Sequence, residues 1–192
     1  HTKPWVTHVC VQAWDVKKMK EWREQYRKPI IDDELEYEGN IRLPWGSITA
    51  RELVHRFWMC CVAGGYAGHG ETYMDPQEIL WWSKGGVLKG ESPKRLAFLR
   101  QVIEATPVEG LQPMTGNWVW GRGRMAGGRS GEFRLFYFSD YQPSYWNIDM
   151  PQKARFKAEI IDTWKMTITP LEQVFEPGAS VPLPSKPNVA LR

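Results

Sequence analysis

The chain has 192 residues, of which 42% are hydrophobic, and this is enough apolar material for a core in one large domain or two small ones. Its 25 Lys and Arg and 22 Asp and Glu residues are spread along the chain and give a net charge of +3. The balance excludes the basic footprint of a nucleic-acid-binding protein. No apolar run approaches the roughly 20 residues needed to span a bilayer, so we expect neither a nucleic-acid nor a membrane partner.

The cysteines and histidines do not form a recognisable framework. Cys10, Cys60 and Cys61 are odd in number, and no Cys-x-x-Cys or His spacing typical of a metal site occurs. We therefore expect no disulfide framework, no metal and no cofactor. Cys60 and Cys61 are adjacent in an apolar helical run, which favours buried thiols over redox chemistry.

The first half of the chain alternates predicted strands and helices. A β-branched run over 5–12 predicts a strand, and Asp15 can cap a helix over about 16–26 with apolar residues on one face. Residues 28–34 predict a second strand, followed by a long loop over 35–48. Strand and helix together form one βα unit.

Two further units follow. Thr49 with Glu52 fits a capping box that begins a helix through about 63, and residues 66–73 predict a third strand whose glycines permit close approach. Ser92 as cap, with a proline after it, begins a helix through about 104. Successive βα units predict a parallel sheet, with ligand sites at the carboxyl ends of its strands.

The amino-acid composition changes after about residue 106, where Gly and Pro become frequent. Residues 132–138, 156–164 and 165–169 predict strands of a small antiparallel β-sandwich. The fold class predicted is thus α/β plus all-β. The predicted domains are 1–106 and 117–192, joined by a linker over 107–116.

The stretch 28–40 is the most informative one, because an apolar pair leads into a cluster of acids. A buried parallel strand can deliver such carboxylates to the rim of a pocket, which makes Glu34 the candidate functional acid. In an ideal strand the Asp33 side chain points away from the face that carries Glu34, so Asp33 would contribute positioning and charge and not attack the substrate. Glu36 and Glu38 are expected to be solvated. The alternative is that all are ordinary solvated loop acids.

Several motifs together resemble a known group of proteins. These are residues 28–34 (KPIIDDE) with 37–40 (YEGN), then 64–66 (GGY) with 68–73 (GHGETY), and 80–86 (LWWSKGG). They are similar to the last three βα units of bacterial TIM-barrel glycoside hydrolases of the apiosidase-like superfamily. A β-sandwich domain commonly follows the barrel in that group, and the tail here resembles it, with IDTW at 161–164 and LPSKP at 183–187.

The resemblance implies a partial (β/α)8 barrel in which the predicted strands are strands six to eight. It places the nucleophile, carried at the end of the seventh strand, on Glu34. The acid/base carboxylate is expected after the fourth strand, outside this chain. The remaining N-terminal barrel half would then come from the same precursor or from a separate chain, because three βα units cannot close a barrel.

The resemblance and the strand positions together indicate a carbohydrate substrate. The candidate substrate-binding residues lie on or after the predicted strands: Asp33, Tyr37, Gln12, His69, Glu71, Trp81, Trp82 and Trp45. An indole face suits the apolar side of a sugar ring, although such residues can also merely cover a barrel rim. His69 could instead be a satisfied core histidine, and Glu71 a capping or salt-bridged loop acid.

We therefore expect a glycoside hydrolase that cleaves O-glycosidic bonds of a plant or microbial polysaccharide or oligosaccharide with retention of configuration. An extracellular or periplasmic location fits such an activity. The alternative is a non-catalytic carbohydrate-binding or structural and interaction module, because one carboxylate without its acid/base partner hydrolyses very slowly.

Overall fold

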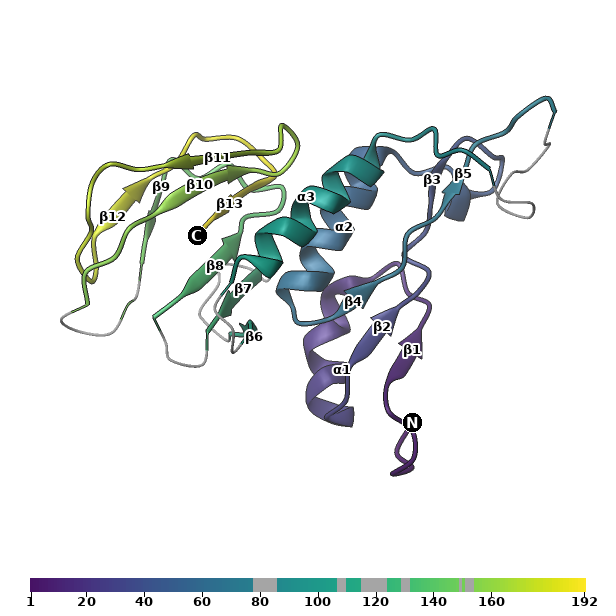
Figure 1. Cartoon of the computed structure of the whole chain (residues 1–192), viewed down its shortest axis with the longest axis horizontal. Coiled ribbons are helices and arrows are strands. Elements are labelled where there is room, and N and C mark those ends of the chain that lie inside the picture. The colour runs from purple at the N-terminus through teal and green to yellow at the C-terminus, as the bar shows by residue number, and fades with distance from the viewer. Residues whose placement is uncertain (78–85, 107–109, 115–123, 129–131, 149, 151–153) are drawn as a thin grey trace. The chain divides into compact units, whose positions relative to one another are not determined.

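The computed structural model describes residues 1–77, 86–106, 110–114, 124–128, 132–148, 150 and 154–192. The chain divides into two compact units, His1–Ala97 and Phe98–Arg192, and helix α3 (Ser92–Glu104) crosses the division (Figure 1). The domain limits predicted from the sequence stay predictions. In the described part of the chain, no helix combines the length and the apolar character that a bilayer crossing requires.

The first unit is built on a three-stranded parallel sheet, as the βα pattern predicted. Its strands are β1 (Val9–Val11), β2 (Ile30–Asp32) and β4 (Tyr66–Ala67), in the order β1-β2-β4 (Figure 1). Cys10 pairs with Ile31, and Ile31 with Tyr66. The strands are shorter than predicted, and β2 ends before Asp33 and Glu34. A partial barrel is compatible with this sheet and stays a proposal.

Two of the predicted capping residues, Asp15 and Thr49, precede helical segments of the first unit. A 3-10 turn, Val16–Lys18, leads into α1 (Met19–Tyr26), and the Asp15 carboxylate accepts a hydrogen bond from the Lys17 N–H. The Thr49 hydroxyl accepts one from the Glu52 N–H at the start of α2 (Ala50–Val62). Helix α1 contacts β2 and α2 contacts β4. The sheet is therefore covered by helices, as in α/β folds.

Two thiols lie in α2. The Cys60 side chain is fully buried and that of Cys61 is partly buried. Burial raises the pKa of Cys60 well above its usual value and that of Cys61 to about 12. Both thiols are consequently protonated at neutral pH, which agrees with the packing role predicted for them.

A second, smaller ladder lies beyond the carboxyl ends of the sheet. The segment predicted as one strand over 66–73 is divided, and its second part, β5 (Glu71–Thr72), pairs in parallel with β3 (Glu38–Gly39). Strand β3 lies in the stretch that was predicted to be a loop, as does a 3-10 turn at Pro44–Gly46. This ladder fixes the two loops that follow β2 and β4 against each other.

The second unit contains a six-stranded antiparallel sheet in the order β11-β10-β13-β8-β7-β6. Its strands are β6 (Gln112–Pro113), β7 (Arg124–Gly127), β8 (Arg134–Tyr137), β10 (Glu159–Asp162), β11 (Thr167–Pro170) and β13 (Val189–Leu191). Strands β9 (Tyr145–Asn147) and β12 (Ser180–Pro182) form a separate antiparallel pair. The prediction of antiparallel strands is confirmed, while a true sandwich stays a proposal.

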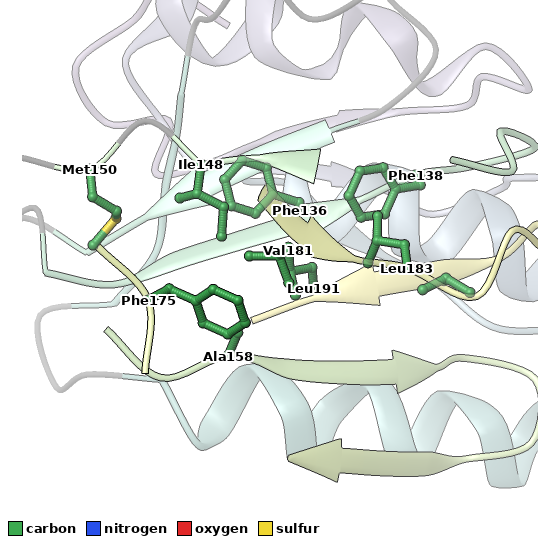
Figure 2. Close-up of a cluster of buried hydrophobic side chains, with 10 residues drawn as sticks. Phe136, Phe138, Ile148, Met150, Ala158, Phe175, Val181, Leu183 and Leu191 are labelled. Atoms are coloured by element: carbon green, nitrogen blue, oxygen red, sulfur yellow. The ribbon is translucent and has the colours of Figure 1, made fainter. Parts of the chain in front are cut away.

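The core of the second unit lies between the large sheet and the β9-β12 pair. Figure 2 shows Phe136 and Leu191 from the sheet, with Phe138 just after β8, gathered with Val181 from β12. Each of these side chains is at most 3% exposed. The shared apolar cluster joins the two sheets, since burial of each large apolar side chain stabilises the unit by about 2 kcal/mol.

Candidate functional site

The first unit contains a cavity of about 710 Å³ at the carboxyl ends of β2 and β4. This is the edge at which parallel α/β sheets place their ligand sites. Six residues predicted from the sequence line it, together with Gly70 and Thr72: Asp33, Glu34, Tyr37, Trp45, His69 and Glu71. Asp33 and Glu34 both face the cavity, because β2 ends at Asp32 and the strict alternation of a strand does not extend to them.

Glu34 and Tyr37 interact within this cavity. The Tyr37 hydroxyl donates a hydrogen bond to the Glu34 carboxylate. Burial, the negative charges of Glu34 and Asp33, and this hydrogen bond together raise the pKa of Tyr37 to about 12. Tyr37 therefore keeps its proton at neutral pH and stays a hydrogen-bond donor beside Glu34.

The Tyr37 side chain is itself held in place. Its ring meets that of Trp45 edge to face, with centroids 6.0 Å apart, and its backbone N–H donates to the Trp45 carbonyl at 2.7 Å. Gly70 packs directly on the ring, since a Cβ at that position would lie 2.7 Å from the Tyr37 Cδ1 atom. Gly68 likewise permits close approach, because a Cβ there would lie 2.8 Å from the Asp33 carbonyl oxygen. The predicted role of these glycines is confirmed.

Glu71 forms the buried side of the cavity, with no exposed surface. Its Oε2 atom accepts hydrogen bonds from the backbone N–H groups of Lys89 at 2.8 Å and Gly90 at 3.0 Å. Its Oε1 atom has no hydrogen-bond partner among the described residues. The His69 Nε2 atom lies 3.9 Å from Oε1. One oxygen of this carboxylate is thus fixed by the backbone, while the other is buried without a hydrogen-bond partner among the described residues.

His69 lies between Glu71 and the start of α3. Its Nε2 atom is 3.1 Å from the Ser92 hydroxyl oxygen. Burial lowers the pKa of His69 and outweighs the opposite effect of the Glu71 and Glu38 charges. The imidazole is therefore neutral at neutral pH and acts as a hydrogen-bonding group rather than a cation.

Glu38 is buried, and the prediction that it is solvated is wrong. Only 1% of the residue is exposed, and its carboxylate accepts hydrogen bonds from the Tyr73 hydroxyl at 2.7 Å and from the backbone N–H groups of Glu91 at 2.8 Å and Ser92 at 3.0 Å. Burial alone would raise its pKa, but these donors lower it. The β3-β5 pairing places Glu38 beneath the amino end of α3, where the helix dipole favours a negative charge.

Glu36 also departs from the expectation of a solvated acid. Its carboxylate forms an ion pair with the Arg56 guanidinium at 2.7 Å, and its side chain is 25% exposed. Arg56 donates in addition to the Leu35 carbonyl at 2.7 Å. These contacts connect the loop after β2 to helix α2, so they support the cavity without lining it.

Asp32 is an acid that the sequence reasoning did not single out. It is fully buried, and its Oδ1 atom accepts a hydrogen bond from the Ala13 N–H at 3.1 Å. The Glu34 backbone N–H also donates to this carboxylate. Its Oδ2 atom has no partner among the described residues, and burial raises the pKa to about 6. The sequence could have indicated this burial, because Asp32 lies two residues after the apolar Ile30 and alternate residues of a strand share a face.

The other candidates lie elsewhere. Gln12 is exposed just after β1 and is absent from the described lining of the cavity. Trp81 and Trp82 fall outside the described residues. Trp45 is 37% exposed at the cavity edge, where an aromatic face can meet a ligand. Within the part of the chain that the structure describes, no group of His, Cys, Asp and Glu side chains is arranged to hold a metal ion.

Comparisons with known proteins point to one class of enzyme. Over 98% of its length the chain resembles a crystal structure described as "a putative glycoside hydrolase from Bacteroides vulgatus ATCC 8482", with 32% identity and a TM-score of 0.85. A glycoside hydrolase family 5 structure from the same organism matches 91% of the chain at 16% identity and a TM-score of 0.65. A further structure named glycoside hydrolase matches 91% at 15% identity and a TM-score of 0.62.

The likeness at 15% and 16% identity shows the fold alone. The chain spans 41% to 45% of the length of these three structures. Residues 120–192 match a family model described as a domain of unknown function (DUF5605). A search of curated proteins gives no significant match. The chain therefore has a glycoside-hydrolase-like fold.

Proposed function

We propose that this chain is the C-terminal part of a retaining glycoside hydrolase that cleaves O-glycosidic bonds of a polysaccharide or oligosaccharide, with Glu34 as nucleophile. The observation that carries the proposal is the position of Glu34, which lies directly after a parallel strand and lines the cavity with Tyr37 hydrogen-bonded to it. The similarity to a glycoside hydrolase structure at 32% identity supports it.

The architecture that goes with this proposal is a partial (β/α)8 barrel. Strands β1, β2 and β4 would be its strands six to eight, and the antiparallel second unit would be the β-sandwich that follows the barrel. The remaining strands and the acid/base carboxylate would come from outside this chain. The more specific assignment to the apiosidase-like superfamily rests on the sequence motifs and is part of the same proposal.

In the proposed reaction the Glu34 carboxylate attacks the anomeric carbon as the glycosidic bond breaks. A second carboxyl group, about 5 to 5.5 Å away, protonates the leaving oxygen. A covalent glycosyl ester on Glu34 results, and water activated by the second carboxylate then hydrolyses it. Two inversions at the anomeric carbon give overall retention.

Tyr37 and Asp33 assist this chemistry without forming the covalent bond. The Tyr37 hydroxyl directs the Glu34 carboxylate toward the cavity, and its raised pKa ensures that it stays a donor. Asp33 adds negative charge close to the position of the oxocarbenium-like transition state, which such charge stabilises. Trp45, His69 and Glu71 would contact the sugar, and Gln12, Trp81 and Trp82 stay predicted contacts.

The test is hydrolysis by the polypeptide expressed from its complete natural coding sequence. A panel of aryl glycosides and oligosaccharides is assayed with the wild type, with Glu34→Gln, and with Glu21→Gln, which changes an exposed glutamate of α1. We expect Glu34→Gln to lower kcat about a thousandfold or more. Glu21→Gln should retain wild-type activity, and all three proteins should have the same thermal unfolding midpoint.

Two outcomes would contradict the proposal. Full activity of Glu34→Gln would remove Glu34 from the reaction. Sugar binding without turnover in both the wild type and Glu34→Gln would instead identify a non-catalytic carbohydrate-binding module, which is the alternative function.

A further inference from the structure

We propose that Glu71 makes the cavity selective for sugar units that carry a hydrogen-bond donor and no negative charge, so that uronic acids and sulfated sugars are rejected. The proposal names the substrate class of the site and rests on the proposed function for its hydrolytic readout. It derives from the hydrogen bonds of Glu71 and from the charges that line the cavity.

Glu71 requires a donor from outside the described residues. The carboxylate has no exposed surface, its Oε2 atom already accepts two backbone N–H groups, and its Oε1 atom accepts none. A buried acceptor without a partner is unfavourable, so the site gains when a ligand supplies one. A sugar hydroxyl or ammonium group can donate to Oε1, whereas a carboxylate or sulfate group cannot.

The charges around the cavity act in the same direction. Asp33, Glu34 and Glu71 contribute three carboxylates, and no Lys or Arg is found among the described residues that line the cavity. His69 does not offset them at neutral pH, because burial lowers its pKa. The Lys89 ammonium group is engaged by the Asp75 carboxylate. An anionic substituent placed among these acids would meet their electrostatic repulsion.

The backbone fixes the Glu71 side chain for this role. Because the Lys89 and Gly90 N–H groups hold Oε2, the carboxylate cannot rotate away from an anionic ligand without breaking two hydrogen bonds. A rigid acceptor discriminates more strongly than a mobile one, since it cannot relax to reduce the penalty. Selectivity against anions is thus a property of the fixed carboxylate and not only of the average charge.

The experiment compares matched sugars that differ only in charge. The complete polypeptide is given aryl glycosides and oligosaccharides of glucose, galactose and mannose, each beside its C6 uronate and its 2-amino analogue. For the sugar that is hydrolysed fastest, we expect the kcat/KM of the wild type to be about a hundredfold higher for the neutral or amino form than for the uronate. A preference for the uronate, or equal rates, would overturn the proposal. The wild-type comparison stands on its own if a variant does not fold.

Glu71→Gln gives a second readout. Glutamine retains the shape and an oxygen acceptor for Lys89 and Gly90 but replaces the free oxygen with an NH₂ donor and removes the charge. We expect kcat/KM for the neutral sugar to fall about tenfold and the neutral-to-uronate ratio to shrink at least tenfold. An unchanged ratio in a folded Glu71→Gln protein would contradict the role of Glu71.

Binding measurements separate this inference from the proposed function. The dissociation constants of the same sugar pairs are measured by NMR with Glu34→Gln. Suppose that neither the wild type nor Glu34→Gln hydrolyses any sugar, but that the neutral sugar of a pair binds about a hundredfold more tightly than its uronate. The catalytic proposal then fails and the selectivity proposal stands. If uronates bind as tightly as neutral sugars, or if no member of any pair binds, the selectivity proposal fails whatever the outcome of the hydrolysis assay.

Discussion

Asp32 should make the stability of the first unit depend on pH in a direction opposite to that of most acids. The group is fully buried, and burial raises its pKa from 3.8 to about 6. Below pH 3.8 the folded and unfolded states both hold the proton, so no penalty arises. Between pH 3.8 and about 6 the unfolded state ionises first, and the free energy of unfolding falls. The shift corresponds to a loss of about 3 kcal/mol once the pH exceeds 6.

Asp32→Asn is the matched perturbation, because asparagine is nearly isosteric and does not titrate. Its side-chain oxygen can still accept the Ala13 N–H. Urea unfolding of the wild type and the variant is measured from pH 3.5 to 8. The stability of Asp32→Asn relative to the wild type should rise by about 2.5 kcal/mol between pH 4 and pH 7.

Glu21→Gln serves as the control, since Glu21 is exposed on α1. Its stability relative to the wild type should change little across the same range. Parallel pH profiles of the wild type and Asp32→Asn would refute the reasoning, because they would show that Asp32 titrates alike in the folded and unfolded states.

Three further changes test the support of the cavity. Glu38→Gln should destabilise the start of α3 by about 1 to 3 kcal/mol, which would appear as faster hydrogen exchange of the Glu91 and Ser92 amides. Unchanged exchange of these amides would contradict the anchoring role of Glu38. Tyr37→Phe should lower kcat about tenfold with little change in the unfolding midpoint, because it removes the donor to Glu34. Gly70→Ala should also lower kcat about tenfold, because the added methyl group displaces the Tyr37 ring. A wild-type kcat in this variant would contradict that role of Gly70.

The elements that depend on local signals could be predicted from the sequence. Thr49 caps α2 as expected, and Asp15 caps the 3-10 turn that leads into α1, because capping requires only residues two or three positions apart. The parallel strands followed from the order of βα units. The cavity could be predicted in outline for a related reason, since side chains that follow neighbouring parallel strands must meet at one edge of the sheet.

Features that depend on long-range pairing could not be predicted. Glu38 resembles a solvated loop acid in the sequence, and only its pairing with Glu71 across β3 and β5 places it beneath α3. The backbone N–H groups that hold the Oε2 atom of Glu71 belong to residues 18 and 19 positions further along the chain. Gln12 was predicted to reach the cavity because of its place near the carboxyl end of the first strand. In the structure β1 already ends at Val11, so Gln12 follows the strand.

Covalent trapping tests the role of Glu34 most directly. The complete polypeptide is incubated with activated 2-deoxy-2-fluoro glycosides of the neutral sugars, which allow the first step and slow the second, and is then digested and analysed by peptide mass spectrometry. The account predicts a single glycosyl adduct on the peptide that contains Glu34, with no adduct in Glu34→Gln. An adduct on a different carboxylate, or a product with inverted anomeric configuration, would contradict it.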